Sequence, residues 1–253
     1  MAFVGTPVCL IAAHGERGGA RDNRRLLAIG AAAQALLPGA DIRCGVLSGE
    51  PSIETVLADA EGRAIIIAPL FMCAGYFTET ALPQRLAETG HVAEILPPVG
   101  ETPEFVRLAA RMVLERGVHD LLVVAHGSTK DDRSRRAAER FAAGLCARSG
   151  IATPPCAYLE EPPFAAEAVE ALPKGGAIMG LFAGAGLHGA EDCRRLITES
   201  GRDDIVLLTP CDDVAAIGRI VSVMFLQALL SRNGANQTPK RDIAPSKPQA
   251  TAA

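Results

Sequence analysis

Residues 121–128 read Leu-Leu-Val-Val-Ala-His-Gly-Ser, an apolar run that ends in a histidine, a glycine and a serine. A strand buried on both faces of a parallel sheet has this continuous apolar character, without alternating polar positions. Similar runs occur at residues 8–13, 64–71, 177–182 and 205–208. We therefore expect a buried parallel strand at each of these positions.

Segments rich in Ala, Leu, Glu and Arg separate these runs, and their apolar residues recur at helical spacing. The clearest of them are 23–37, 104–116, 135–148, 190–200 and 214–231. Alternation of strands and helices predicts an α/β fold, in which helices cover the sheet through right-handed crossovers.

The sequence around His14 returns around His126. Four blocks match in the same order and at nearly constant spacing: 13–15 with 125–127, 47–51 with 159–163, 71–75 with 182–186, and 96–98 with 208–210. We interpret the chain as two copies of one α/β unit, residues 1–117 and 118–232, each with four or five strands. Residues 233–253 are rich in polar residues and Pro, have no apolar face, and are predicted to form a disordered tail.

Composition excludes several classes of protein. The chain has 253 residues, of which 49% are hydrophobic, so it can bury one large core or two modest ones. Its formal net charge of −4 and its 4% aromatic content do not favour a nucleic-acid surface. The longest uncharged apolar stretch, 64–77, contains Pro69 and Gly75 and is too short and broken to span a membrane.

The seven cysteines are odd in number and form no Cys-x-x-Cys pair. This pattern predicts neither a disulfide framework nor a zinc site made of thiolates. We expect a protein of the reducing cytoplasm, with most of its cysteines buried as small apolar residues.

Three residues of the second unit each follow a predicted strand: His126, Glu160 and His188. Ligands of open α/β sheets bind at the carboxyl ends of the strands, so these side chains are expected to converge on one mouth of the sheet. Two imidazoles and a carboxylate suit a divalent first-row metal such as Zn, Co, Ni or Fe(II), with a position left open for a substrate.

The first unit keeps only part of this set. It has His14, but Ser48 stands at the position of Glu160 and Phe77 at the position of His188. For His14 or His126 taken alone, a hydrogen bond to a loop carbonyl at a strand end is an equally good interpretation. That interpretation does not explain why the second unit adds His188 and Glu160, so we favour a metal site there.

Other catalytic motifs find little support. His14-Gly15-Glu16 is similar to the Arg-His-Gly-Glu of histidine phosphatases, but Ala13 replaces the arginine that would hold phosphate. The chain has no Gly-x-Ser-x-Gly elbow and no phosphate-binding P-loop motif. Arginines such as Arg133 follow the His-Gly turns, where they would attract a ligand bearing several carboxylates.

The same segments resemble the class II tetrapyrrole chelatases, the family of the sirohydrochlorin cobaltochelatases and ferrochelatases. The matching motifs are Ala-His-Gly-Ser at 125–128, Leu-Glu at 159–160, and Phe182 through Gly-Leu-His at 186–188 to Asp192. Together with the duplication, the resemblance covers both units and leaves out only the tail.

This resemblance implies two duplicated flavodoxin-like units whose parallel sheets face a central cleft. His126, Glu160 and His188 then bind the metal and accept the pyrrole protons. The further substrate-binding candidates are His14, Ser128, Leu187 and Arg133. Many two-domain members carry the complete site in the first half, whereas Ser48 and Phe77 place it here in the second.

The implied activity is insertion of a divalent metal into sirohydrochlorin or a related tetrapyrrole with several carboxylates, in cobalamin or sirohaem biosynthesis. The metal (Co²⁺, Fe²⁺ or Ni²⁺) is a substrate, and no organic cofactor is implied. Two alternatives stay open: a non-catalytic carrier of tetrapyrrole or metal, and an unrelated α/β enzyme or bilobed binding protein. We expect no nucleic-acid or membrane partner, and a monomer or homodimer.

Overall fold

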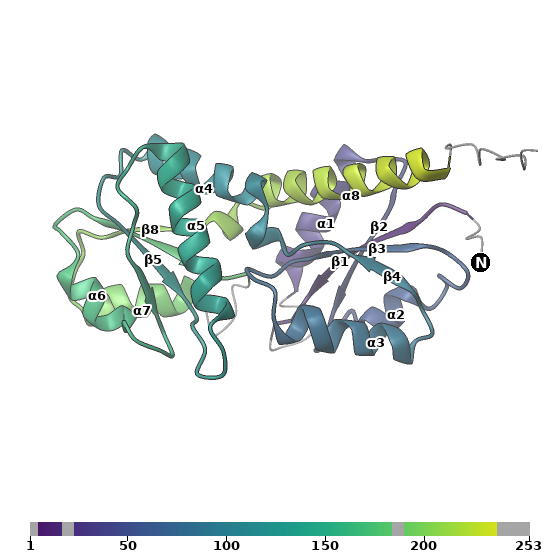
Figure 1. The fold of residues 1–253 in the computed structure, drawn as a ribbon, viewed down its shortest axis with the longest axis horizontal. Coiled ribbons are helices and arrows are strands. Elements are labelled where there is room, and N and C mark those ends of the chain that lie inside the picture. The colour runs from purple at the N-terminus through teal and green to yellow at the C-terminus, as the bar shows by residue number, and fades with distance from the viewer. Residues whose placement is uncertain (1–4, 17–22, 184–189, 237–253) are drawn as a thin grey trace, which may run out of the picture.

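The computed structural model describes residues 5–16, 23–183 and 190–236, and Figure 1 shows them as two lobes connected by helices. The strands are β1 (Val8–Ala13), β2 (Asp41–Val46), β3 (Ile65–Pro69), β4 (Ala93–Ile95), β5 (Leu121–Ala125), β6 (Cys156–Tyr158), β7 (Ala177–Leu181) and β8 (Val206–Leu208). The α-helices are α1 (Arg24–Leu36), α2 (Ile53–Leu57), α3 (Leu82–Glu88), α4 (Pro103–Glu115), α5 (Arg133–Ser149), α6 (Ala165–Ala171), α7 (Ala190–Glu199) and α8 (Val214–Asn236). Short turns of other helix types are η2 (Phe77–Ala81), η3 (Val99–Glu101) and η4 (Pro210–Asp212).

Each lobe contains a parallel sheet, and within the described residues both sheets have four strands. Their orders, β2-β1-β3-β4 and β6-β5-β7-β8, are the same when one unit is laid over the other. This is the order with which flavodoxin-like sheets begin. The predicted fold class, two duplicated α/β units with parallel sheets, is therefore confirmed.

The central strands lie where the apolar runs predict them. β1 and β5 have the predicted bounds, and β3 and β7 begin or end within two residues of them. The edge strands β2 and β4 of the first sheet were not predicted, because they are only partly buried and have no continuous apolar run. In β2, Arg43 donates a 2.8 Å hydrogen bond to Asp41 and lowers the pKa of that carboxyl, so charged residues replace the apolar run.

The two lobes exchange their last helices. α4 ends the first unit in sequence, yet it packs against α5 of the second lobe (Figure 1). α8 ends the second unit and runs back over the first lobe to pack against α1. The boundary between 117 and 118 remains a prediction about sequence units, because the packing of both helices crosses it.

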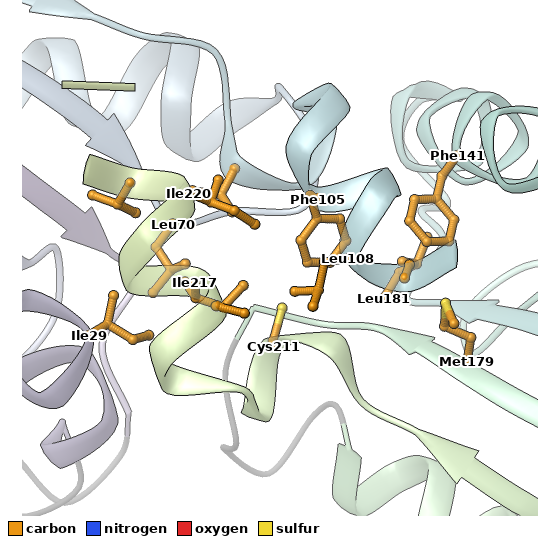
Figure 2. Close-up of a cluster of buried hydrophobic side chains, with 14 of the residues drawn as sticks. Ile29, Leu70, Phe105, Leu108, Phe141, Met179, Leu181, Cys211, Ile217 and Ile220 are labelled. Atoms are coloured by element: carbon orange, nitrogen blue, oxygen red, sulfur yellow. The ribbon is translucent and has the colours of Figure 1, made fainter. Parts of the chain in front are cut away.

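One continuous core joins the lobes as a result. In Figure 2, Phe105 from α4 and Ile217 from α8 lie within a single cluster that also contains Ile29 of α1 and Phe141 of α5. The opposite face of each sheet has its own smaller cluster, under α2 and α3 in the first lobe and under α6 and α7 in the second. One face of each sheet thus packs within its own lobe, and the other face packs into the core that the two lobes share.

α8 is apolar along most of its length. Residues Val214–Arg232 have the length and the mean hydropathy, 1.8, of a membrane span, and no second such helix occurs in the described ranges. Half of this segment is buried inside the protein, and the core helices of soluble proteins can have the same length and hydropathy. α8 continues to Asn236, four residues into the predicted tail; residues 237–253 lie outside the described residues.

The contact between α1 and α8 depends on a glycine. A Cβ atom added at Gly218 would lie 2.6 Å from Cβ of Ala32 and 3.1 Å from the carbonyl oxygen of Ile29. We predict that Gly218→Ala lowers the free energy of unfolding by about 1–3 kcal/mol, because overpacking outweighs the better helix propensity of alanine. Urea denaturation measures the change.

The matched control for this substitution is Gly39→Ala, since nothing lies within 4 Å of a Cβ at that position. It should leave the urea midpoint unchanged or raise it slightly. Equal urea midpoints for Gly218→Ala and wild type would contradict the prediction, because they would mean that α1 and α8 can move apart without loss of stability.

Candidate functional site

His126 sits in a tight turn directly after β5. Its Nδ1 atom lies 3.2 Å from the carbonyl oxygen of Gly127, and its side chain is 43% exposed. Gly127 has φ +76°, and a Cβ there would come within 2.8 Å of Cβ of Tyr158. The turn therefore requires glycine, and it presents the imidazole at the carboxyl end of the sheet.

Glu160 is brought to the same place by the loop after β6. Its backbone N–H donates a 3.0 Å hydrogen bond to the carbonyl oxygen of His126. Its carboxylate Oε2 lies 3.6 Å from Nδ1 of His126, and its side chain is 54% exposed. Two of the three predicted metal ligands therefore lie side by side, each with a partly exposed side chain.

His188 and Leu187 lie outside the described residues. The described segments before and after residues 184–189 lie close to His126 and Glu160. Leu181, the last residue of β7, pairs with Ala125 next to His126. Asp192 and Arg195 of α7 line a cavity of about 430 Å³. His126 and Glu160 line the same cavity. Among residues 5–16, 23–183 and 190–236, no cluster of three or more His, Cys, Asp or Glu side chains is suited to a metal.

The predicted substrate-binding residues Ser128 and Arg133 both have partners within the protein. The Ser128 hydroxyl accepts a 3.1 Å hydrogen bond from the backbone N–H of Lys130. Arg133 forms an ion pair with Glu79, which belongs to the first unit, and lies 3.6 Å from Asp131. A role for either residue in substrate binding remains a prediction.

Glu161, which is not among the predicted site residues, stabilises the turn from its buried side. Its side chain is buried, and Oε1 accepts a 3.1 Å hydrogen bond from the backbone N–H of Ser128. Oε2 accepts from the guanidinium of Arg135, and this hydrogen bond raises the pKa of Arg135. Two adjacent glutamates were visible in the sequence, but the direction of each side chain depends on the loop.

The first unit builds the same turn with different side chains. Nδ1 of His14 lies 3.1 Å from the carbonyl oxygen of Gly15, and the N–H of Ser48 donates 2.8 Å to the carbonyl oxygen of His14. Ser48 therefore occupies the backbone position of Glu160. The Phe77 ring lies edge-on to the His14 ring, with centroids 4.6 Å apart.

The carboxyl ends of the two sheets face each other. Arg25, in α1 of the first unit, donates to the carbonyl oxygen of Ala183 just after β7 and to the Asp212 carboxylate at 2.7 Å. The Arg133–Glu79 ion pair joins the segment after β5 to the segment after β3. His14, Arg25 and Ala183 also line a small cavity of about 80 Å³, so both units contribute to this region.

Known proteins share this fold. The sequence model of the CbiX family matches residues 8–116. The solved structure of CbiX, described as the terminal enzyme for biosynthesis of siroheme in denitrifying bacteria, is 31% identical, with a TM-score of 0.74. That match covers 87% of this chain and 98% of the other. The chain belongs to the CbiX family. The predicted resemblance to the class II chelatases is thereby confirmed.

Two more distant structures share the fold of this CbiX-family chain. SirB from Bacillus subtilis with Fe³⁺ is 13% identical, with a TM-score of 0.74, and the match covers 91% of this chain and 98% of that one. The sirohydrochlorin chelatase SirB from Bacillus subtilis subspecies spizizenii, in complex with cobalt, is 15% identical, with a TM-score of 0.71 and coverage of 92% and 98%. The comparison with curated proteins found no match.

The two neighbouring glutamates should respond differently to truncation. We predict that Glu161→Ala lowers the free energy of unfolding by about 2 kcal/mol, because the Ser128 N–H and Arg135 lose a buried acceptor. Glu160→Ala, at an exposed side chain, should change it by less than about 0.5 kcal/mol. Equal losses for the two variants in urea denaturation would contradict the assignment of Glu161 as the structural residue.

Proposed function

We propose that this CbiX-family chain is a sirohydrochlorin chelatase that inserts Co²⁺ or Fe²⁺ into the macrocycle. His126, Glu160 and His188 of the second unit bind the metal in this proposal. The neighbouring structures support the choice of metals, since one SirB structure contains Fe³⁺ and the other contains cobalt. The N/O ligand set accepts either metal, so their supply decides which is used.

One observation carries the assignment of the site. In the first unit, Phe77 touches His14 from the position that the sequence repeat matches with His188. Because the two sheets and the two His-Gly turns have the same construction, a residue at position 188 is expected beside His126 in the same way. Glu160, 3.6 Å from His126, would complete the set.

The residues fit the chemistry of insertion. The incoming M²⁺ exchanges water for two imidazoles and a carboxylate, and the macrocycle loses two pyrrole protons as its nitrogens bind the metal. As the metal passes to the macrocycle nitrogens, it leaves the imidazoles and the Glu160 carboxylate, and these freed groups can accept the two protons. Arg195 lines the same cavity and offers a guanidinium to the carboxylates of the substrate.

The cysteines take no part in this proposal. All seven are free thiols, and burial raises the pKa of Cys9, Cys193 and Cys211 to about 12, which keeps these three protonated. These buried thiols are therefore not among the proposed ligands.

We place the protein in the cytoplasm, in cobalamin or sirohaem biosynthesis, with no nucleotide or organic cofactor.

Substitution of the three ligands should abolish turnover without abolishing tetrapyrrole binding. We predict that His126→Ala, His188→Ala and Glu160→Gln each lower the rate of metal insertion by about 100-fold or more. An anaerobic absorbance time course with sirohydrochlorin and Co²⁺ or Fe²⁺ measures the rate above a blank without protein. His119→Ala is the matched control, because His119 is an exposed histidine that precedes β5 instead of following it, and this variant should retain the wild-type rate.

Three other results would contradict this proposal in different ways. Activity that survives His188→Ala but disappears in His14→Ala would move the site to the first unit. A spectral shift on mixing without faster insertion would indicate a carrier. Neither a shift nor acceleration would mean that the substrate is not this tetrapyrrole.

A further inference from the structure

Three aromatic side chains gather at the mouth of the first sheet, beside His14. Phe71 follows β3, and Tyr76 and Phe77 stand at the start of η2. The Phe77 ring stacks on the Phe71 ring at 5.9 Å with an interplanar angle of 18°, and Tyr76 meets Phe77 edge-on at 5.5 Å. We call Phe71, Tyr76 and Phe77 the aromatic platform.

Two rings of the platform are open to solvent, whereas most of the other aromatic side chains that the structure describes are buried and Phe164 of the second unit, 42% exposed, is the exception. Tyr76 is 64% exposed and Phe77 is 39% exposed. Phe105, Phe141 and Phe225, by contrast, are buried in the core. The chain is only 4% aromatic and has no tryptophan, so two exposed rings in contact are a concentrated apolar surface.

At the carboxyl end of the first sheet, the two positions that hold proposed metal ligands in the second unit carry other residues. Phe77 stands where the second unit has His188, and Ser48 stands where it has Glu160. The backbone of the turn is unchanged, as the hydrogen bond from Ser48 to His14 shows. The replacements exchange metal ligands for a flat apolar surface and a small side chain.

The platform belongs to the region where the two units meet. Glu79, two residues after Phe77 in the same turn of helix, pairs with Arg133 in the segment that follows His126. Arg25, which lines the cavity with His14 and Phe71, donates to Ala183 of the second unit. A ligand on the platform therefore lies at the boundary with the unit that carries His126 and Glu160.

We propose that one face of the tetrapyrrole lies on the aromatic platform while the metal arrives from the second unit at the other face. This inference rests on the proposed function. A macrocycle is a large flat π system, and aromatic rings bind such faces by offset or edge-on stacking. The first unit then supplies the apolar surface under the macrocycle, and the second unit supplies the metal ligands.

Two single substitutions test the platform in the full-length protein without metal. Tyr76→Ala and Phe77→Ala should each weaken sirohydrochlorin binding about 10-fold in an anaerobic absorbance titration. The loss of one aromatic ring that stacks on a nucleic-acid base has an effect of this size. In turnover assays, KM for sirohydrochlorin should rise similarly while KM for Co²⁺ stays unchanged. Tyr76→Ala removes an exposed ring, so it reports on binding even if Phe77→Ala fails to fold.

Val92→Ala is the matched control, because Val92 is an exposed apolar residue of the first unit (75% exposed) outside the platform. It should bind sirohydrochlorin as wild type does, and Phe77→Trp should restore binding that Phe77→Ala loses. Unchanged titrations for both alanine variants, with wild type binding normally, would overturn the platform and leave the proposed function standing.

Two further outcomes separate this inference from its alternatives. If the alanine variants bind sirohydrochlorin normally but shift from dimer to monomer in light scattering, the rings contact a second copy of the chain and the platform is overturned. If wild type itself does not bind sirohydrochlorin, the proposed function fails and the platform fails with it.

Discussion

The exchange of α4 and α8 between the lobes is the interaction on which the rest of the molecule depends. Each helix covers apolar surface that the other unit cannot bury alone, and Phe105 and Ile217 meet in one core (Figure 2). Separation of the lobes would expose both halves of that core to water. The same packing holds the carboxyl ends of the two sheets opposite each other, which gives the region between them its geometry.

Because the chain is a duplication, the same His-Gly turn occurs at the carboxyl end of both sheets, with different side chains around it. The backbone of the His-Gly turn is the same in both units, because the glycine and the hydrogen bond to the following loop determine it. The side chains around the turn are free of that constraint. Ser48 and Phe77 could therefore stand in one unit where the repeat has Glu160 and His188 in the other, while the fold was retained. Glu160 lies beside His126.

Much of the fold could be predicted because the central strands are buried on both faces and therefore read as continuous apolar runs. The edge strands β2 and β4 of the first sheet could not. In β2, Asp41 and Arg43 pair with each other at the border of the sheet, so the strand has no continuous apolar run. At the candidate site, strand ends pointed to His126 and Glu160. Glu161 was missed, because its burial under Ser128 depends on the path of a loop that no periodicity describes.

The sequence by itself determined the repeat, the parallel α/β class and the family, because these follow from local patterns and from motifs in a definite order. The tertiary structure alone decided which helix covers which sheet, which of two adjacent glutamates turns inward, and that Phe77 stacks in an exposed cluster. The physical reason is that an apolar pattern shows that a face will be buried. It does not show which partner, from the same unit or the other, will bury it.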